Sequence, residues 1–570
     1  MASGPLWPPG ESSVSFPPGI DFFPGLFKDK DVNFNFMTIR PMEPDSPKES
    51  WNTRIGVILA VTGSAVGLGN FLRFPGQAAQ NGGGLFMIPY LIAFVIVGIP
   101  LAWSEWALGR YGGRMGYNSA PGIFRRVLHT RKGAYVGMLG TVMPVLIYTY
   151  YVLVEALCLY YAWHFLSGTI PALGDSVEAV GVFFVQSLGL AADGALFSAE
   201  GAPFLGFVLF CFLLNFFLIY RGIHQGIEKF CLYAMPLLVL CAFIVLARVL
   251  TLPAVDGRGI LGGLGFMWNP ASEGGRILET LANPEVWVAA TGQIFFSLSV
   301  GFGLILTYAS YLKKDDDVAL SSLTSVAGNG FCEVVLGGLI ALPAAFIFLG
   351  PVFLSDPGNI GTFSLGFVTL PNVFNQMPAG AFFGFLFFFL LFLSAVTSSL
   401  SMLQPAIALL EEGLGITRKP SVAILGLVTF LGTLFIAYFS AGATALDTVD
   451  FWMANFFIFI FATLQTLIFG WVIGAKRGYE ELCAGAEIRI PRWIMPMIQI
   501  VSPAYLLIIF GFWSVGRLPA RIQGMLHPPE GEPPVVLMSI GFILLVITFF
   551  AFVIARANRR WPDPRETDPS

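Results

Sequence analysis

Two short segments of the sequence place closely spaced glycines and small polar residues inside long apolar runs. The first is Gly67-Leu68-Gly69 and the second is Ser297–Gly303. Glycine costs about 1 kcal/mol in a helix interior relative to alanine, so each segment predicts a broken helix. A break inside a membrane leaves backbone groups unpaired, at several kcal/mol each, unless they find partners. A bound cation can pair with the carbonyl groups, and an anionic group can pair with the amides that begin the next half-helix.

A plainer interpretation of these glycines is that they only permit close packing between helices. For one segment alone the two interpretations are equally good. Two such segments, five apolar spans apart, favour binding. The two segments lie in the first span of each of two sets of five spans. An inverted repeat requires this arrangement.

The composition indicates a membrane protein. Of the 570 residues, 56% are hydrophobic and 12% are charged, against roughly 25% charged in an average soluble domain. A chain with so little charge cannot cover itself with a hydrated surface, so we expect a lipid bilayer around it. Twelve stretches are long enough to span a bilayer, and they lie near 52–75, 84–109, 134–166, 204–221, 226–251, 284–312, 319–349, 380–411, 421–440, 448–474, 491–514 and 535–556.

The distribution of basic residues predicts the orientation. Lys and Arg gather in the loops after the second, sixth and tenth spans, whereas the loop at about 168–203 has acidic residues and neither Lys nor Arg. The positive-inside rule therefore places both termini in the cytoplasm. We expect a flexible cytoplasmic tail, a ten-helix transport core, two further helices and a cytoplasmic C-terminal tail, at residues 1–46, 47–475, 476–557 and 558–570 respectively. The apolar connection at 350–380 is expected to fold back as a cap over an outer vestibule.

Other classes of function find little support. The sequence has no Ser/His/Asp or Cys/His arrangement and no GxxxxGK[ST] loop, so we predict that it is not an enzyme. The net charge is -4 and there is no basic stripe interleaved with aromatics, so no nucleic-acid partner is expected. The six cysteines form no CxxC pair and are interpreted as small core residues.

Several stretches are similar to a known family. They are Trp51 to Tyr111 with Asn81-Gly82-Gly83-Gly84 and Glu105, Tyr150-Tyr151-Val152 with Glu155, Arg221-Gly222 onward, Gln293 to Tyr311, and Thr397-Ser398-Ser399 with Gln404-Pro405. On these residues the chain resembles the neurotransmitter:sodium symporters, and among them the bacterial amino-acid transporters typified by the leucine transporter. The resemblance implies an all-α integral membrane fold of twelve transmembrane helices, with a five-plus-five inverted repeat and with helices 1 and 6 unwound at mid-membrane. It also implies a bacterial inner-membrane location, with a homodimer as a further expectation.

The resemblance further implies two co-transported Na+ ions and one amino-acid substrate. The first sodium site would use Ala65, Asn70, Ser297 and Asn329 with the substrate carboxylate. The second would use Gly63, Val66, Ser394, Thr397 and Ser398. The substrate site would comprise Ala65, Gly67, Leu68, Gly69, Ile147, Tyr151, Phe296, Ser297, Ser299, Phe302, Ser398 and Met402.

Two positions sharpen these implications. Relatives that carry monoamines have an aspartate where this chain has Gly67. The absence of that aspartate favours a ligand with its own carboxylate, and the apolar pocket favours a hydrophobic amino acid.

Glu333 follows Asn329 by one helical turn, so both face the same way. Chloride-dependent relatives have a serine at that position. We therefore expect chloride-independent transport, with Glu333 binding a proton when the carrier returns empty.

The resemblance also implies two gates. Arg73 would pair with Asp450 at the outer side, with Asp447 as an alternative partner. At the inner side Lys48 and Trp51 would hold Glu412. The function that follows is sodium-coupled import of a neutral, hydrophobic L-amino acid by alternating access. The alternative that we keep open is a membrane amino-acid sensor that binds without net transport.

Overall fold

The structure is a computed structural model that describes residues 49–269, 277–354, 356, 358–526 and 534–565. The predicted tail at 1–46, together with Lys48 and residues 566–570, lies outside these described residues. Apart from an isolated bridge between Val255 and Arg258, the described secondary structure is helical. The predicted all-α class is therefore confirmed.

Eleven of the twelve predicted spans match described helical stretches that are long and apolar enough to cross a membrane, with one bent pair counted as a single span. Ten described helical stretches are long and apolar enough to cross a membrane. A further span consists of α1 (Arg54–Ala65) and the π-turn η1 (Gly69–Arg73) continued by α2 (Phe74–Gln80), bent by 47° at the break. The remaining span consists of α13 (Pro284–Leu298) and α14 (Leu304–Ala309).

The other membrane spans are built as follows: η2 (Gly83–Phe86), α3 (Met87–Ala93), η3 (Phe94–Gly98) and α4 (Ile99–Arg114); α7 (Leu139–Leu166); α9 (Ala202–Tyr220); η6 (Ile223–Glu228) and α10 (Lys229–Leu250); α15 (Val318–Gly330), η8 (Phe331–Gly337) and α16 (Gly338–Leu354); α19 (Gly380–Leu414); α20 (Arg418–Tyr438); η10 (Ala441–Ala443), α21 (Thr444–Asp450), η11 (Phe451–Phe457), α22 (Ile458–Leu467) and η12 (Ile468–Ile473); α24 (Ile494–Pro496), η13 (Met497–Val501) and α25 (Ser502–Leu526); and α26 (Val535–Arg560). The connections contain α5 (Ala120–Val127), α6 (Gly133–Gly137), η4 (Pro171–Leu173), α8 (Val177–Ser187), η5 (Ala195–Phe197), α11 (Ile260–Trp268), α12 (Ile277–Ala282), α17 (Thr362–Ser364), η9 (Leu365–Thr369), α18 (Leu370–Gln376) and α23 (Ala475–Cys483).

Both breaks follow from local backbone conformation. Helix α1 stops because Val66 is extended, with φ −72° and ψ 96°. Helix α13 stops at Ser299, which has φ +54°, and Gly301 and Gly303 follow at φ +81° and +83°. Glycine adopts such left-handed angles readily, whereas a serine rarely does. The glycine spacing in the sequence thus placed both breaks correctly.

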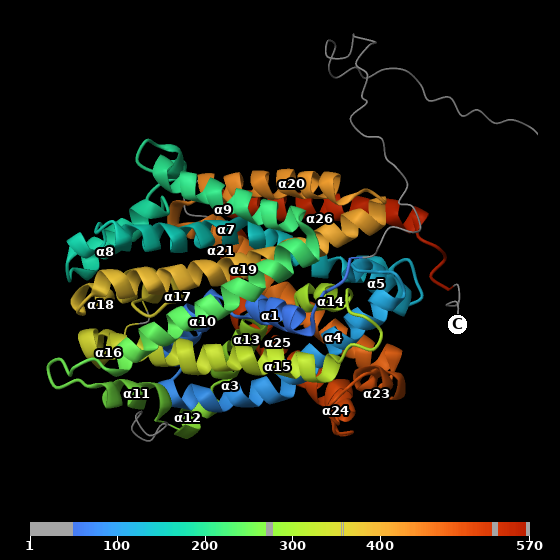
Figure 1. Ribbon diagram of the computed structural model, residues 1–570, viewed down its shortest axis with the longest axis horizontal. Helices are drawn as coiled ribbons and strands as arrows, with labels where there is room; N and C mark the ends of the chain where they lie inside the picture. The colour runs from blue at the N-terminus through green and yellow to red at the C-terminus, as the bar shows by residue number, and fades with distance from the viewer. Residues whose placement is uncertain (1–48, 270–276, 355, 357, 527–533, 566–570) are drawn as a thin grey trace, which may run out of the picture. The chain divides into compact units, whose positions relative to one another are not determined.

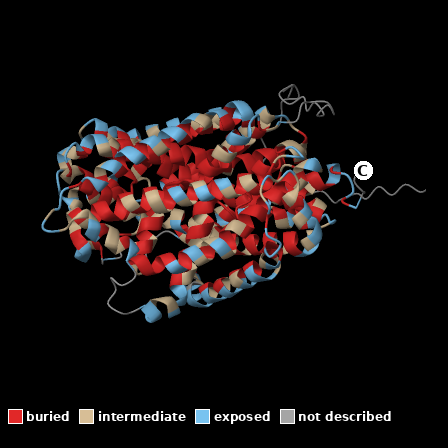
Figure 2. Cartoon of the chain, turned by 60° about the horizontal axis from the view of Figure 1, so that its bottom comes forward, coloured by how far each residue is buried: buried red, intermediate tan, exposed pale blue. Residues whose placement is uncertain are grey.

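Helices α7 and α19 pack against each other along their length and lie among the remaining spans (Figure 1). Of the most apolar window of α7, 94% is buried, against 33% for α9 and for α26. The outward faces of the peripheral helices are exposed while their inward faces are buried (Figure 2). Exposed residues such as Phe210, Phe217 and Leu545 are apolar, as the surface of a membrane-spanning protein must be.

Candidate binding site

A central cavity lies between the two breaks and holds about 460 Å³ of empty space. Its lining residues are Ser64, Ala65, Gly67, Leu68, Gly69, Pro144, Ile147, Tyr151, Phe296, Ser299, Phe302, Leu304, Ser398 and Met402. Eleven of the twelve residues predicted for the substrate site are among them, the exception being Ser297. Sequence reasoning missed Ser64, Pro144 and Leu304, which lie within three positions of the predicted residues Ala65, Ile147 and Phe302.

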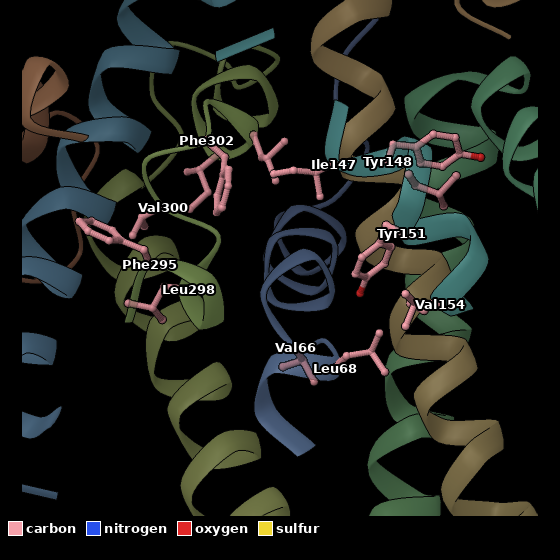
Figure 3. Close-up of a cluster of buried hydrophobic side chains, with 14 of the residues drawn as sticks. Val66, Leu68, Ile147, Tyr148, Tyr151, Val154, Phe295, Leu298, Val300 and Phe302 are labelled. Atoms are coloured by element: carbon pink, nitrogen blue, oxygen red, sulfur yellow. The ribbon is translucent and has the colours of Figure 1, made fainter. Parts of the chain in front are cut away.

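The cavity has one polar edge against mostly apolar walls. Tyr151 projects from α7 toward the broken first span, while Ile147 and Phe302 lie together nearby (Figure 3). A Cβ atom added to Gly67 would lie 3.3 Å from Ser398 Oγ and 3.5 Å from Tyr151 Oη. Position 67 therefore faces the cavity, and the chain places no charge there.

The oxygens predicted for the first cation site converge beside the first break. Asn329 Oδ1 lies 3.1 Å from the Ser297 carbonyl oxygen and 3.2 Å from the Ala65 carbonyl oxygen. Asn70 Nδ2 donates to that same atom at 2.9 Å, and Asn70 Oδ1 accepts from Gly67 N at 2.9 Å. Carbonyl, amide and hydroxyl oxygens are the hard donors that suit an alkali cation.

The oxygens predicted for the second cation site lie between α1 and α19. Thr397 Oγ1 is 2.7 Å from the Gly63 carbonyl oxygen and 2.8 Å from the Ser394 carbonyl oxygen. Ser398 Oγ is 3.1 Å from the Ser394 carbonyl oxygen, and Val66, also predicted here, is fully buried at the start of the break. Four of the five predicted residues therefore meet in one place through atoms that can bind a cation.

Glu333 is fully buried beside the first cation site. Its carboxylate accepts hydrogen bonds from Tyr90 Oη at 2.6 Å, from Gln293 Nε2 and from Ser297 Oγ. Asn329 Nδ2 contacts the same Ser297 Oγ at 2.7 Å, so one hydroxyl group connects the carboxylate to the cation site. Glu333 therefore lies next to Ser297 and Asn329, two of the residues predicted for the first cation site.

Glu105 on α4 has a role that the sequence did not reveal. Its Oε1 accepts the amide N–H of Gly301 at 3.0 Å, inside the second break. Gly301 cannot make a helical hydrogen bond there, and a buried N–H without a partner is costly. Glu105 therefore stabilises the unwound segment. Its only signal in the sequence is an acidic residue inside an otherwise apolar span.

At one end of the first span lies a second cavity, which we call the Arg73 cavity, with about 730 Å³ of empty space. It shares Leu68, Gly69, Tyr151 and Phe296 with the central cavity, so these residues separate the two. Its lining residues are Leu68, Gly69, Leu72, Arg73, Tyr150, Tyr151, Val154, Phe296, Thr362, Phe363, Phe367, Leu446, Asp447, Asp450, Ala454 and Asn455. Thr362, Phe363 and Phe367 belong to the segment 350–380, so this segment contributes to the wall of the Arg73 cavity, and its role as a cap over an outer vestibule stays a prediction.

The predicted ion pair between Arg73 and Asp450 is not formed in this structure. Arg73 donates to the Gly292 carbonyl at 3.1 Å and to Gln293 Oε1 at 3.2 Å, and its guanidinium lies 4.8 Å from the centre of the Phe296 ring. Asp450 accepts from Tyr150 Oη at 2.6 Å and from Asn455 Nδ2 at 3.0 Å. Both charged groups line the Arg73 cavity, which lies between them.

The opposite end of the first span, which we call the Trp51 end, corrects another prediction. Glu412 accepts hydrogen bonds from Asn118 N, Ser119 N and Ser119 Oγ and does not bind Trp51, while Lys48 lies outside the described residues. Trp51 Nε1 instead donates to the Tyr308 carbonyl at 2.8 Å. The predicted contact between Trp51 and Glu412 is therefore absent, because the indole N–H binds a backbone carbonyl of α14, while the Lys48 part of the prediction is not tested by the described residues. Glu411, which precedes Glu412, faces Arg418 at 3.8 Å.

Other contacts hold the Trp51 end closed. Arg418 forms an ion pair with Glu49 at 2.9 Å, and Arg54 forms one with Asp317 at 3.1 Å. The buried Glu228 accepts from the backbone N–H groups of Asn52 and Thr53, each at 3.0 Å, and from Thr53 Oγ1 at 2.8 Å. These contacts fix the segment that begins α1.

A helical membrane protein with two facing broken spans, oxygen clusters beside them and a cavity between them has the architecture of an ion-coupled transporter. The chain matches the profile of the Sodium:neurotransmitter symporter family over residues 48–179 and 182–557. The chain therefore belongs to this family of sodium-coupled symporters. It is a multi-pass membrane transporter and not an enzyme.

Similar proteins agree with this assignment. An uncharacterized sodium-dependent transporter of Methanocaldococcus jannaschii is 30% identical over 463 residues, which is 80% of this chain and 89% of that protein. An uncharacterized sodium-dependent transporter of Haemophilus influenzae is 27% identical over 485 residues, covering 81% of this chain and 97% of that protein. The crystal structure of MhsT in complex with L-phenylalanine superposes with a TM-score of 0.68 at 26% identity, covering 81% of this chain and 99% of MhsT.

Proposed function

We propose that this sodium-coupled transporter imports a neutral, hydrophobic L-amino acid by alternating access. The supporting observation is the central cavity, which offers the backbone of the Gly67–Gly69 break and the Tyr151 hydroxyl group to a carboxylate and mainly apolar walls to a side chain. No fixed carboxylate stands at position 67 to bind a lone amine. The similar MhsT structure contains L-phenylalanine, which is a ligand of the proposed class.

Two sodium ions would accompany each substrate. The oxygen cluster of Ala65, Asn70, Ser297 and Asn329 would bind one ion, and the cluster of Gly63, Val66, Ser394, Thr397 and Ser398 would bind the other. Each ion gains roughly 2.3 kcal/mol per 100 mV of membrane potential. Two ions could therefore support about a thousandfold accumulation of substrate, since about 1.4 kcal/mol corresponds to a factor of ten.

Glu333 would supply the negative charge that chloride supplies in other relatives. Its carboxylate meets the first cation site through Ser297 Oγ, and it would bind a proton when the carrier returns without cargo. Replacing chloride by gluconate should leave uptake by the natural chain unchanged, whereas uptake by Glu333→Ser should require chloride. Loss of uptake by the natural chain in gluconate would refute this proposal.

The orientation that we propose places the Trp51 end at the cytoplasm of a bacterial inner membrane and the Arg73 cavity at the outer face. It is supported by the basic residues of the loops at the Trp51 end, for example Arg110 and Arg114 after the second span. Residues 47–475 would then form the transport core, with 476–557 as two accessory helices and both termini in the cytoplasm. We propose a homodimer and no nucleic-acid partner.

The decisive experiment is uptake of labelled amino acids into proteoliposomes with and without a sodium gradient. We expect sodium-dependent accumulation of large apolar amino acids, such as phenylalanine or leucine, and not of aspartate, lysine or dopamine. Sodium-independent uptake would contradict the ion-binding assignments. Ligand binding without uptake would instead identify a sensor.

A further inference from the structure

A groove opens toward the membrane between α9, η6 with α10, and α19. It holds about 780 Å³ of empty space and does not include any residue of the central cavity. Its lining residues are Phe217, Leu218, Arg221, Gln225, Gly226, Lys229, Phe230, Tyr233, Ala234, Leu237 and Leu393. These residues sort into a polar end and a long apolar part.

The polar end of the groove presents hydrogen-bond donors and positive charge. Arg221, Gln225 and Lys229 are all exposed and stand four residues apart in the sequence. Arg221 Nη2 donates to Gln225 Oε1 at 3.3 Å, which leaves the amide NH2 group of Gln225 available as a further donor. Among the ion pairs of the described residues, none involves Arg221 or Lys229.

No carboxylate of the groove neutralises this charge, because none lines it. Two carboxylates lie close to this end of the groove. Glu228 is 1% exposed and directs its oxygens to Asn52, Thr53 and His224. Glu49 lies beside Gly222 and forms its ion pair with Arg418. Two uncompensated cations beside an amide donor are the groups that bind a phosphate diester. Charge complementarity therefore selects an anionic ligand.

The apolar part of the groove selects a ligand with a hydrocarbon chain. Phe230, Tyr233 and Leu237 follow the cations along α10 toward the middle of the membrane, and Phe217 on α9 faces the same space. Tyr233 is 72% exposed and Phe217 is 55% exposed, although both lie within helices that span the membrane. An aromatic surface in lipid, with cations only at its end, matches a headgroup followed by an acyl chain.

We propose that this groove is a binding site for an anionic phospholipid. The phosphate lies between Arg221 and Lys229, and one acyl chain runs along Phe230, Tyr233 and Leu237. A zwitterionic lipid binds more weakly, because its own ammonium group competes with the two cations for the phosphate. The site is independent of which amino acid the central cavity takes.

The bound lipid would contact the wall of the second cation site. Met235 on α10 approaches Gly63 so closely that a Cβ atom at Gly63 would lie 2.9 Å from Met235 Sδ. Leu393 lines the groove and precedes Ser394, whose carbonyl oxygen belongs to that cation site. A lipid along Phe230, Tyr233 and Leu237 therefore supports the stretch of α10 that lies behind the proposed second cation site.

The test compares lipid retention by native mass spectrometry after reconstitution with equal amounts of palmitoyl-oleoyl phosphatidylglycerol and phosphatidylcholine. The natural chain should retain phosphatidylglycerol in preference to phosphatidylcholine. The variant Arg221→Gln with Lys229→Gln should bind phosphatidylglycerol about 25-fold more weakly, at about fivefold for each cation lost. A second experiment supplies a short-chain phosphatidylglycerol as the only anionic lipid. The natural chain should retain it more weakly than palmitoyl-oleoyl phosphatidylglycerol, because the acyl chain contributes to binding as well.

The matched control is Lys476→Gln with Arg477→Gln on α23, which removes one lysine and one arginine that are also exposed. It should retain phosphatidylglycerol as the natural chain does. Equal retention of phosphatidylglycerol by both double variants would overturn the proposal, as would displacement of the lipid by millimolar glycerol phosphate, because a phosphate pocket alone would then suffice. Both variants should melt at the natural temperature in phosphatidylcholine, since none of the four side chains is buried.

Discussion

The two ends of the first broken span differ in how their charges are paired. At the Trp51 end, carboxylates meet cations or backbone amides directly, as Glu228 does with Asn52 and Thr53. At the other end, Arg73 and Asp450 bind uncharged partners on either side of the Arg73 cavity. A direct contact fixes a distance between two elements, whereas a cavity leaves that distance free to change. The difference indicates that the structure holds the Trp51 end closed and leaves the Arg73 end able to close further.

The largest effect on uptake should come from removing the Trp51 indole, which packs against α14. Trp51 is 5% exposed, donates to the Tyr308 carbonyl and packs edge-on against the Tyr308 ring at 5.3 Å. Truncating a buried tryptophan costs about 3–5 kcal/mol. In Trp51→Ala we expect concentrative uptake to fall at least about 100-fold, and Cys231, buried on α10, to react with a maleimide.

Labelling of Cys231 followed by mass spectrometry checks this expectation. The matched control is Trp163→Ala, because Trp163 is 55% exposed on the membrane-spanning α7. An unreactive Cys231 in Trp51→Ala would show that the Trp51 end stays closed without the indole.

A smaller effect is expected from Glu228→Gln. The amide can still accept one hydrogen bond, but it loses the charge that strengthens the bonds from Asn52 N and Thr53 N. Hydrogen bonds to a charged group contribute about 1.5–3 kcal/mol. The rate of Cys231 labelling should rise roughly 10- to 30-fold, while Glu178→Gln, at an exposed residue of α8, leaves it unchanged. An unchanged rate in Glu228→Gln would mean that the indole alone holds this end.

The Arg73 end should respond differently from the Trp51 end. No ion pair joins Arg73 to Asp450 in this structure. The effects of substituting the two residues on the free energy of ligand binding should therefore add. In a double-mutant cycle with Arg73→Gln and Asp450→Asn, we expect a coupling below about 0.5 kcal/mol for binding measured by calorimetry. A coupling above about 1.5 kcal/mol would show that the two groups pair directly in the ligand-bound protein.

The smallest effect is expected at Arg54, whose side chain is 37% exposed where it contacts Asp317 and Glu487. The pair with Glu487 is exposed, and exposed ion pairs contribute about 0.2–1 kcal/mol and are screened by salt. Asp317 is 3% exposed, but it keeps hydrogen bonds from Leu320 N and Glu487 N when the guanidinium is removed. Arg54→Gln should therefore change Cys231 labelling less than about fivefold, and the change should shrink as choline chloride is raised. An effect that persists at high choline chloride would place Arg54 among the essential contacts of this end.

The sequence predicted the breaks and the central cavity because these depend on residue types at short spacing. Glycines at 67, 69, 301 and 303 determine where helices cannot continue, and many of the lining residues lie at or beside the two breaks, whereas those on α7 and α19 were named from the family resemblance. The family resemblance named the hydroxyl groups of Thr397 and Ser398 for the second cation site, and the structure places both against carbonyl oxygens in the last turn of α1, although ion binding there stays a proposal.

The charged contacts at the two ends could not be predicted in the same way. Glu411 and Glu412 are neighbours in the sequence, and only the rotation of α19 decides which of them meets Arg418. The partners Glu49 and Arg418 are separated by 369 positions, so no spacing rule connects them. The direct pair expected between Arg73 and Asp450 depends on how far the Arg73 cavity has closed, which is a property of a conformation and not of a sequence.

The hydrogen bonds around Glu333 have a consequence for how binding must be measured. Gln293, Glu333 and Ser297 connect in turn to Asn329, and Asn70 then connects that amide to the backbone N–H of Gly67. The proposed ion and the proposed substrate thus share one set of dipoles and are linked thermodynamically. If sodium strengthens substrate binding by some factor, the substrate strengthens sodium binding by the same factor. A sodium titration and a substrate titration should therefore return one coupling free energy, and Asn70→Ala should reduce both by the same amount.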